Sequence, residues 1–229
     1  RPRRLALFAL VRQGNPGVID RICREPELSL IKQLSQLGEK DLPREVRLNL
    51  PAYAIKALDA QYGSERVEAM MRALNQPAPL DLRVNILKTD RNTAMMELAK
   101  VDVIAAPTKF SPWGLRVQGK PLISLTPLFQ SGAIEVQDEG SQLLALLLGA
   151  KRGEMVADFC AGAGGKTLAL GMQMRNTGRL YAFDVSARRF DKLKPRLVRS
   201  GLSNVVTIGI ESENDIRIKR LAGKLDRVL

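Results

Sequence analysis

The sequence predicts an α/β protein whose C-terminal part forms a doubly wound parallel sheet. Short apolar runs alternate with helical segments from residue 137 onward, which is the order of strand–helix–strand units. A loop with three glycines follows the first of these runs and opens a helix. Asp184 ends the second run, about 20 residues further along the chain. These features predict a Rossmann-like half, preceded by a small α+β module and by N-terminal helices.

Residues 1–76 are predicted to form helices that pack as a bundle with a partly basic exterior. Ser64 should be the N-cap of one helix, because its hydroxyl can accept a hydrogen bond from the first turn. No chemistry is assigned to this region. The segments with helical spacing are 5–11, the face made by Leu30, Ile31, Leu34 and Leu37, then 51–58, and 64–74.

Residues 77–136 are predicted to form a small α+β module with an open sheet, separated from the helices by the proline-containing linker 75–79. The formal net charge of the chain is +12, which favours a polyanionic partner such as nucleic acid. Basic side chains of the module either contact RNA phosphates or lie on solvated strand faces; they are Arg83, Lys88, Arg116 and Lys120. The expected β-α-β-β-α-β order has strands at 80–87, 104–109, 114–117 and 133–136 and helices at 93–99 and 123–129.

Residues 137–229 are predicted to form the Rossmann-like half. The helix that follows Asp184 should open near Ser186, and Pro195 should kink it or divide it in two. A helix stop and turn is expected at 201–204. The remaining elements are strands at 155–159, 178–184 and 205–210, the first half of a strand at 226–229, and helices at 141–148, 167–174 and 216–221.

The glycine turn between Phe159 and Thr167 is the strongest functional signal in the chain. A phosphate-binding P-loop would need a glycine at Cys160, and a dinucleotide fingerprint would need one at Thr167. The turn still suits a nucleoside, because Asp184 at the next strand end can bind both hydroxyls of a ribose. A ribose without a pyrophosphate predicts S-adenosylmethionine, with its amino-acid end on the turn. The alternative is a glycine turn that serves packing alone.

The chain contains no histidine and only two cysteines, Cys23 and Cys160. The lack of histidine removes Ser-His-Asp and Cys-His catalysis and histidine-containing zinc sites. Two distant cysteines form neither a Cys-only zinc site nor a disulfide framework, so we expect no metal and a reducing cytoplasm. No apolar run approaches the ~20 residues of a membrane span and no signal peptide opens the chain, so no membrane contact is expected.

Several motifs give the chain a resemblance to a known family. They are Gln137-Asp138-x-x-Ser141, the loop from Asp158 to Thr167, Asp184, and the segment from Leu225 to Leu229. In this order they resemble the bacterial Fmu/Sun (RsmB-like) RNA cytosine-5 methyltransferases. Segment 80–88 is similar to the RNA-binding module of that family, and the resemblance covers about residues 45–229. The family loop usually has a proline where this chain has Ala163, which loosens the turn slightly.

The resemblance implies an S-adenosylmethionine methyltransferase fold and methyl transfer to C5 of cytosine in RNA, with ribosomal RNA ahead of transfer RNA. In such enzymes a cysteine thiolate adds at C6 of the base and makes C5 nucleophilic. The cysteines of that step belong to Pro-Cys and Thr-Cys motifs that would follow Leu229, so we expect a piece of a longer protein and assign no catalytic residue. Cys160 is not a substitute, because it matches a position in the cofactor loop.

The resemblance also implies which residues contact the cofactor. Asp184 should bind the ribose hydroxyls, and Ser212 falls at the position near the adenine, where Glu211, Glu213 or Asp215 are alternatives. The turn should line the methionine end of the cofactor through Cys160, Ala161, Gly162, Ala163, Gly164, Gly165 and Lys166.

Two other interpretations stay open. A non-catalytic RNA-binding protein could retain the cofactor fold as a scaffold. An oxidoreductase would need a dinucleotide site, against which the missing glycine argues. Arg188 and Arg189 either reach RNA phosphates or lie solvated on their helix.

Overall fold

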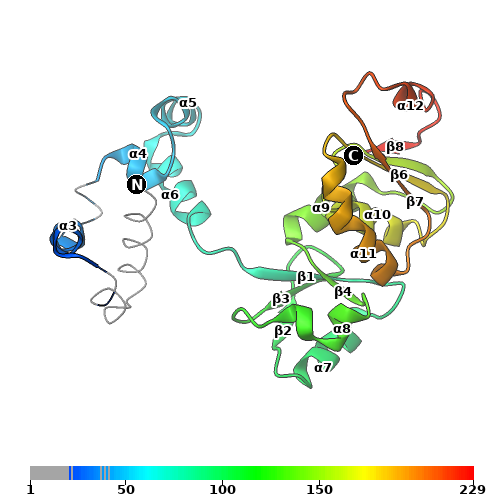
Figure 1. The fold of residues 1–229 in the computed structure, drawn as a ribbon, viewed down its shortest axis with the longest axis horizontal. Coiled ribbons are helices and arrows are strands. Elements are labelled where there is room, and N and C mark those ends of the chain that lie inside the picture. Colours follow the sequence, from blue (N-terminus) through cyan, green and yellow to red (C-terminus); the bar gives the residue numbers. More distant parts are fainter. Residues whose placement is uncertain (1–20, 22, 37, 39, 41) are drawn as a thin grey trace. The chain divides into compact units, whose positions relative to one another are not determined.

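The chain forms two compact units, Arg1–Pro77 and Ala78–Leu229 (Figure 1). The computed structural model describes residues 21, 23–36, 38, 40 and 42–229. The predicted apolar helix at 5–11 lies outside these residues. Within them, no helix has the length and apolar character that crossing a membrane requires.

The described part of the first unit is helical, as the sequence predicts. Leu48, Ile55, Val67 and Met71 form its buried core and come from the last three of its α-helices. Leu37 and the side chain of Leu34 lie outside the described part, so the predicted apolar face stays a prediction. The α-helices are α3 (Glu25–Gln36), α4 (Arg44–Leu48), α5 (Ala52–Tyr62) and α6 (Ser64–Leu74).

The prediction that Ser64 is the N-cap of α6 is wrong. Gly63 occupies that position with φ 80°, and Ser64 is the first helical residue. The Ser64 hydroxyl instead accepts a hydrogen bond of 2.7 Å from Arg44, which also pairs with Asp59 at 2.5 Å. A cation that approaches from α4 therefore uses the oxygen that a capping interaction would have needed.

The second unit begins with an antiparallel sheet that has the predicted β-α-β-β-α-β order. Two helices, α7 (Arg91–Ala99) and α8 (Pro127–Gln130), lie on one side of it (Figure 1). They share a core with the strands that includes Leu82, Leu98 and Leu128. In spatial order the strands are β2 (Ala105–Pro107), β3 (Gly114–Val117), β1 (Leu80–Val84) and β4 (Ile134–Val136).

The helix predicted at 123–129 is interrupted. A 3₁₀ turn, η2 (Ile123–Leu125), comes first; the next residue, Thr126, is extended with ψ 144°, and α8 begins at Pro127. The ring of a proline disfavours a helical conformation for the residue before it, so the chain restarts the helix with Pro127 in the first turn.

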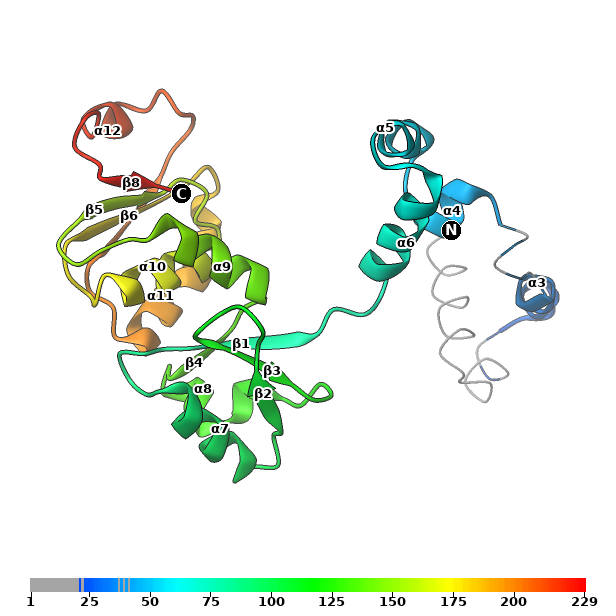
Figure 2. The same ribbon diagram turned by 180° about the vertical axis from the view of Figure 1, so that it is seen from behind.

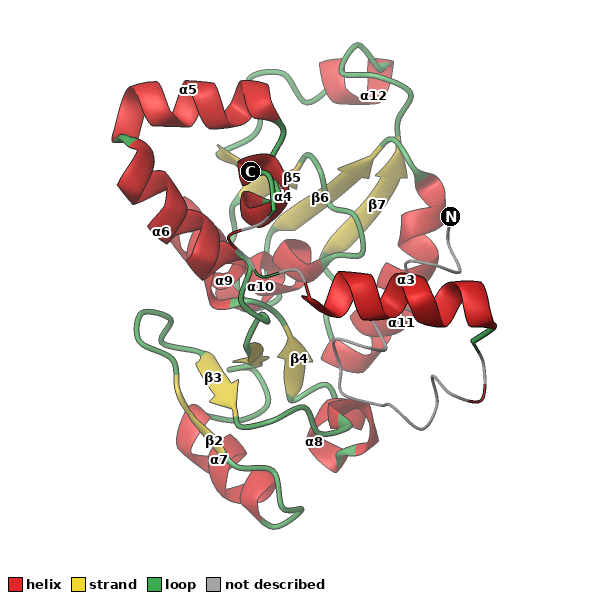
Figure 3. Cartoon of the chain, turned by 90° about the vertical axis from the view of Figure 1, so that its left-hand side faces the viewer, coloured by secondary structure: helices red, strands yellow, loops and turns green. Residues whose placement is uncertain are grey.

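A parallel sheet forms the remainder of the second unit, as predicted. Its spatial order is β7-β6-β5-β8, and every neighbouring pair is parallel. Figure 3 shows β6 and β7 running in the same direction. The strands are β5 (Met155–Asp158), β6 (Arg179–Asp184), β7 (Val205–Gly209) and β8 (Arg227–Val228); the helices are α9 (Glu139–Leu148), α10 (Gly165–Gln173), η3 (Ala187–Arg189), α11 (Phe190–Ser200) and α12 (Ile216–Lys219).

Helix α9 links the two sheets, because it packs against both α10 and β1. Its buried Gln142 donates hydrogen bonds to the carbonyls of Leu82 and Gln137, at 3.2 and 2.9 Å. One face of β1 therefore packs on α7 and α8, while its other face meets α9. At the far end of the unit, α12 lies in the loop between β7 and β8 (Figure 2).

Pro195 does not divide the helix that contains it. α11 continues through Pro195 to Ser200, where Gly201 ends it in the left-handed conformation with φ 79°. Of the two outcomes predicted for Pro195, division is wrong. The predicted helix stop at 201–204 is confirmed.

Candidate functional site

The glycine turn connects the carboxyl end of β5 to the start of α10. Gly162 and Gly164 have φ values of 56° and 86°, in the left-handed region that side chains disfavour. At Gly164 a Cβ atom would lie 2.1 Å from Cδ1 of Leu193, so neither the conformation nor the space admits another residue. Gly165 differs, because its φ is not positive and an added Cβ would make an ordinary contact. The turn therefore depends on two of its three glycines.

Asp184 connects this turn to the end of β6. Its buried carboxylate accepts hydrogen bonds from the amides of Gly162 and Ser186, each at 2.8 Å, and it lies 3.4 Å from Arg189. Burial by itself raises the pKa of Asp184. The two amide hydrogen bonds and the charge of Arg189 outweigh that effect, so the pKa lies below its usual value. Asp184 is therefore an ionised acceptor at neutral pH.

Asp158, the last residue of β5, is fully buried beside the turn. One of its oxygens accepts a 2.7 Å hydrogen bond from the hydroxyl of Thr167, and the other has no partner in the described structure. Burial raises the pKa of Asp158, and the Thr167 hydrogen bond and the Lys166 charge offset only part of that effect. Sequence reasoning gave this residue no role, although an acid that ends an apolar run before a glycine turn was a usable signal.

A cavity of about 250 Å³ opens where β5, β6 and β7 end. The structure thus brings together three of the predicted contacts, Cys160, Asp184 and Ser212. Of the alternatives near Ser212, Glu211 and Glu213 line the cavity, whereas Asp215 does not and binds Arg217 at 2.6 Å. The full lining is Phe159, Cys160, Asp184, Val185, Arg189, Ile210, Glu211, Ser212 and Glu213.

The remaining predicted residues lie in the turn itself and do not line that cavity. Gly162 and Ala163 border an adjoining hollow with Arg188, Arg189 and Lys192. Ala161 is buried, and Gly165 and Lys166 form the first turn of α10. Among the described residues, no group of three or more His, Cys, Asp or Glu side chains could hold a metal ion.

Two arginines hold the carbonyl groups of the turn. Arg83 of β1 donates to the carbonyl of Gly165 at 2.7 Å, and Arg196 of α11 donates to the carbonyl of Ala163 at 2.5 Å. Arg83 is buried and also donates to Gln137 Oε1 at 2.6 Å. Burial lowers the pKa of Arg83 to about 10, against the opposing effect of the Glu135 carboxylate. The antiparallel sheet therefore reaches the glycine turn directly.

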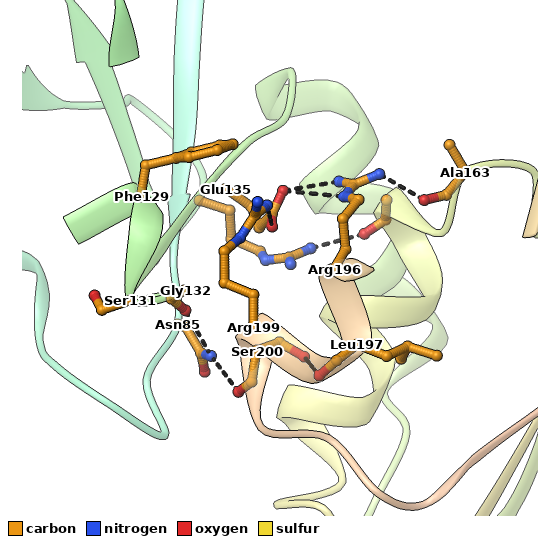
Figure 4. A network of polar contacts seen from close by, with 12 residues as sticks. Asn85, Phe129, Ser131, Gly132, Glu135, Ala163, Arg196, Leu197, Arg199 and Ser200 are labelled. Carbon is orange, nitrogen blue, oxygen red and sulfur yellow. Dashed lines mark hydrogen bonds and ion pairs between the residues drawn. The ribbon is translucent and has the colours of Figure 1, made fainter. Parts of the chain in front are cut away.

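Glu135 of β4 holds Arg196, the arginine that donates to the carbonyl of Ala163 (Figure 4). Its buried carboxylate accepts from Arg196 at 2.9 Å and from Arg199, whose guanidinium lies 4.0 Å from the centre of the Phe129 ring. Figure 4 shows Arg196 between Glu135 and the carbonyl of Ala163. One carboxylate thus fixes two cations, one of which supports the turn.

The basic residues predicted on the strands of the α+β module have different environments. Arg83 is buried, so both interpretations offered for it, contact with RNA and a solvated face, are wrong. Lys88 donates to the carbonyls of Ser131 and Arg199, each at 2.6 Å, and Arg116 pairs with the buried Asp81 at 2.8 Å. Lys120 is exposed.

Two family models match the chain. A ferredoxin-like domain of RsmF/B-like methyltransferases matches residues 50–123, and the 16S rRNA methyltransferase RsmB/F family matches residues 145–229. The second match includes the glycine turn, Asp184 and all four parallel strands. The chain belongs to the RsmB/F methyltransferase family.

Relatives of this RsmB/F chain extend the comparison. It is 30% identical to the ribosomal RNA small subunit methyltransferase B of Pasteurella multocida, over 93% of this chain and 46% of that protein. It is 32% identical to the human 28S rRNA (cytosine(4447)-C(5))-methyltransferase, over 76% of this chain and 21% of that protein. A crystal structure of a methyltransferase homolog from Pyrococcus horikoshii matches with a TM-score of 0.72 and 30% identity, over 84% of this chain and 62% of that one. The chain spans less than half the length of these two curated relatives.

Proposed function

We propose that this chain carries the S-adenosylmethionine site and an RNA-binding module of a ribosomal RNA cytosine-5 methyltransferase. The observation that carries the proposal is the hydrogen bond between Gly162 of the turn and Asp184 at the end of β6. It joins two strand ends at the carboxyl edge of the sheet, where open parallel sheets bind ligands. We further propose the division into helices at 1–76, an α+β module at 77–136 and a cofactor domain at 137–229.

The residues of the site fit the proposed cofactor. Gly162 leaves open space beside the turn for a ligand, an ionised Asp184 can accept from ribose hydroxyls, and Ser212 lies across the same cavity as Asp184. Residues 160–166 would hold the methionine end, Asp184 the ribose and Ser212 the adenine. The buried Asp158 oxygen without a partner is a further acceptor beside the turn. S-adenosylmethionine, when bound, supplies an electrophilic methyl group.

The proposed methyl acceptor is C5 of cytosine in ribosomal RNA. The relatives' names support this choice, since one is a ribosomal RNA methyltransferase and another a cytosine-C5 methyltransferase. The covalent step assigned to this family needs a thiolate that adds at C6 and is expelled after the C5 proton is removed. The Pro-Cys and Thr-Cys motifs implied for that step do not occur in residues 1–229. Cys160 lines the cofactor cavity, and we propose no nucleophilic role for it.

Calorimetry with the purified chain tests the proposal. We expect S-adenosylmethionine to bind and NAD not to bind, since the turn lacks the dinucleotide fingerprint. Asp184→Ala should abolish detectable binding of S-adenosylmethionine. Asp184→Asn retains the shape of the side chain and should weaken binding by a smaller factor.

Asp191→Ala is the matched control, because Asp191 is an exposed acid of α11 outside the cavity. Its affinity for S-adenosylmethionine should equal that of the parent chain, and circular dichroism should confirm that all variants fold. Unchanged affinity in Asp184→Ala would reject the site. Binding of NAD in preference to S-adenosylmethionine would favour the oxidoreductase interpretation.

A further inference from the structure

Basic residues line one face of the helix that follows β6. Lys192, Arg196 and Arg199 are spaced by four and three positions, which places them on the same side of α11. Arg188 and Arg189 lie in η3, the 3₁₀ turn that leads directly into α11, and border the same hollow as Lys192. We call these five residues the α11 basic stripe. From Arg189 to Arg199 it is about 15 Å long, at the helical rise of 1.5 Å per residue.

The stripe lies along two adjoining hollows. One, of about 490 Å³, is bordered by Arg188, Arg189, Lys192 and the turn residues Gly162 and Ala163. The other, of about 340 Å³, is bordered by Lys192, Arg196 and Arg199 together with Phe129, Glu135, Val136 and Ala163. Lys192 and Ala163 border both hollows, so the stripe forms one wall of a groove that runs from the cofactor turn to β4.

The groove has an excess of positive charge. Within the described structure, two carboxylates pair with the stripe: Asp184 with Arg189, and Glu135 with Arg196 and Arg199. Arg188 and Lys192 are exposed and form no ion pair with a described carboxylate. Glu135 and the Phe129 ring also fix the geometry of two of the cations, so little side-chain entropy remains to be lost when they bind an anion.

We propose that the α11 basic stripe binds successive phosphates of a single-stranded segment of RNA. The inference rests on the proposed function and names the path by which its substrate passes the methyl donor. Exposed cations along a groove are the means by which proteins follow a nucleic-acid backbone. The strand is single there, because an enzyme that modifies a base needs that base out of a duplex. Arg188 and Arg189 are the two residues of the stripe that the sequence already offered as RNA contacts, whereas Arg83 of the antiparallel sheet is buried.

Fluorescence anisotropy with a labelled single-stranded RNA oligonucleotide tests this path. The test variant is Arg188→Glu combined with Lys192→Glu, which reverses both unpaired charges of the stripe. We expect the RNA affinity of the 229-residue chain to fall about tenfold or more at moderate salt, because two phosphate contacts are lost and replaced by repulsion. The slope of log K against log salt should become shallower by about 1.4, or about 0.7 for each contact.

The matched control combines Lys194→Glu with Lys224→Glu. Both residues are exposed and neither borders the groove, while the change in net charge equals that of the test variant. Its affinity should fall less than about threefold, since only the long-range field changes. Equal losses in the two double variants would overturn the proposal, because net charge alone would then explain binding. Unchanged RNA affinity in the test variant would overturn it as well.

Two further measurements keep the outcome interpretable. Lys192→Ala removes one charge without introducing a repulsive one, and it replaces the double variant if that variant is unstable. The RNA affinity of Lys192→Ala should be about threefold lower than that of the parent chain. S-adenosylmethionine affinity, measured on the same samples, separates this inference from the proposed function. If the test variant binds both S-adenosylmethionine and RNA as the parent chain does, the proposed RNA path is rejected and the proposed function is not. If the parent chain binds no S-adenosylmethionine, the proposed function is rejected.

Discussion

The two sheets of the second unit use their buried charged residues differently. In the antiparallel sheet, both oxygens of Asp81 and both oxygens of Glu135 accept hydrogen bonds from arginine. In the parallel sheet, Asp158 keeps one oxygen without a partner in the described structure, and Asp184 is held by two amides beside a cavity. The two carboxylates of the first sheet are therefore fully paired within the fold, although Nε of the buried Arg83 has no partner in the described structure.

This difference indicates that features which lower the stability of the fold gather at the carboxyl edge of the parallel sheet. A buried carboxylate with an unused acceptor is unfavourable unless something else binds it. Left-handed glycines and a half-open cavity occur at the same edge, at Gly162 and Gly164. The carboxyl edge of β5 and β6 therefore combines several features that are typical of binding sites.

The largest expected effect tests whether the geometry of the turn is obligatory. Gly164→Ala places a Cβ 2.1 Å from Leu193 and requires a left-handed alanine, so the free energy of unfolding should fall by about 3 kcal/mol. The midpoint of thermal unfolding should fall by roughly 6–12 °C. Gly165→Ala is the control and should change the stability by less than about 0.5 kcal/mol, because its Cβ has ordinary space. Similar midpoints for the two variants would contradict this account of the turn.

The next effect tests the link between the sheets. Arg83→Met removes both hydrogen bonds of the buried guanidinium and leaves the Gly165 carbonyl and Gln137 Oε1 without their donor. We expect a loss of about 2–3 kcal/mol in urea unfolding. Lys120→Met, an exposed basic residue of the same module, should change the stability by less than about 0.5 kcal/mol. If Arg83→Met were as stable as the parent chain, the buried contact would not support the turn.

The smallest expected effect is a gain in stability rather than a loss. Asp158→Asn keeps an oxygen for the Thr167 hydroxyl and removes a buried charge, so the stability at pH 7 should rise by roughly 1 kcal/mol. The folded pKa of Asp158 is raised, so the cost of its charge is fully present above that pKa. The gain from the substitution should therefore shrink as the pH falls toward the ordinary pKa of about 3.9.

Asp184→Asn is the matched substitution at the neighbouring strand end. The folded pKa of Asp184 is lowered, so its carboxylate contributes stability above the ordinary pKa and loses that contribution as the pH falls through the folded value. Asp184→Asn should therefore destabilise the protein at pH 7. Thermal unfolding of both variants between pH 3 and pH 8 measures the two trends, and parallel trends would show that the two strand ends do not differ.

The backbone of the second unit could be predicted because its signals are local. Apolar runs, glycines and helix stops gave every strand of both sheets to within a few residues, and the glycine turn with Asp184 gave the location of the cavity. The errors at Ser64 and Arg83 came from contacts between segments distant in sequence, whereas those at 123–129 and Pro195 concern the local effect of a proline. Arg44 binds Ser64 across 20 positions, and nothing near Ser64 signals that its hydroxyl has another partner.

Arg83 shows the same limit at the site. It alternates with Leu82 and Val84, which are core residues, and such a pattern predicts that its side chain faces solvent. The side chain is buried because the second face of β1 is also covered, by α9 and the turn. Only the arrangement of two sheets around one helix shows this, and that arrangement is not encoded in the spacing of residues within β1.

Because the buried residue at position 83 is an arginine, its hydrogen bond to the glycine turn does not depend on pH. Even with its pKa lowered to about 10, Arg83 keeps its proton in all but about one molecule in a thousand at pH 7. A lysine moved by burial from its lower ordinary value would lose that margin and release the Gly165 carbonyl in mildly alkaline surroundings. The protein can therefore meet fluctuations in cellular pH without loosening the loop beside its cavity.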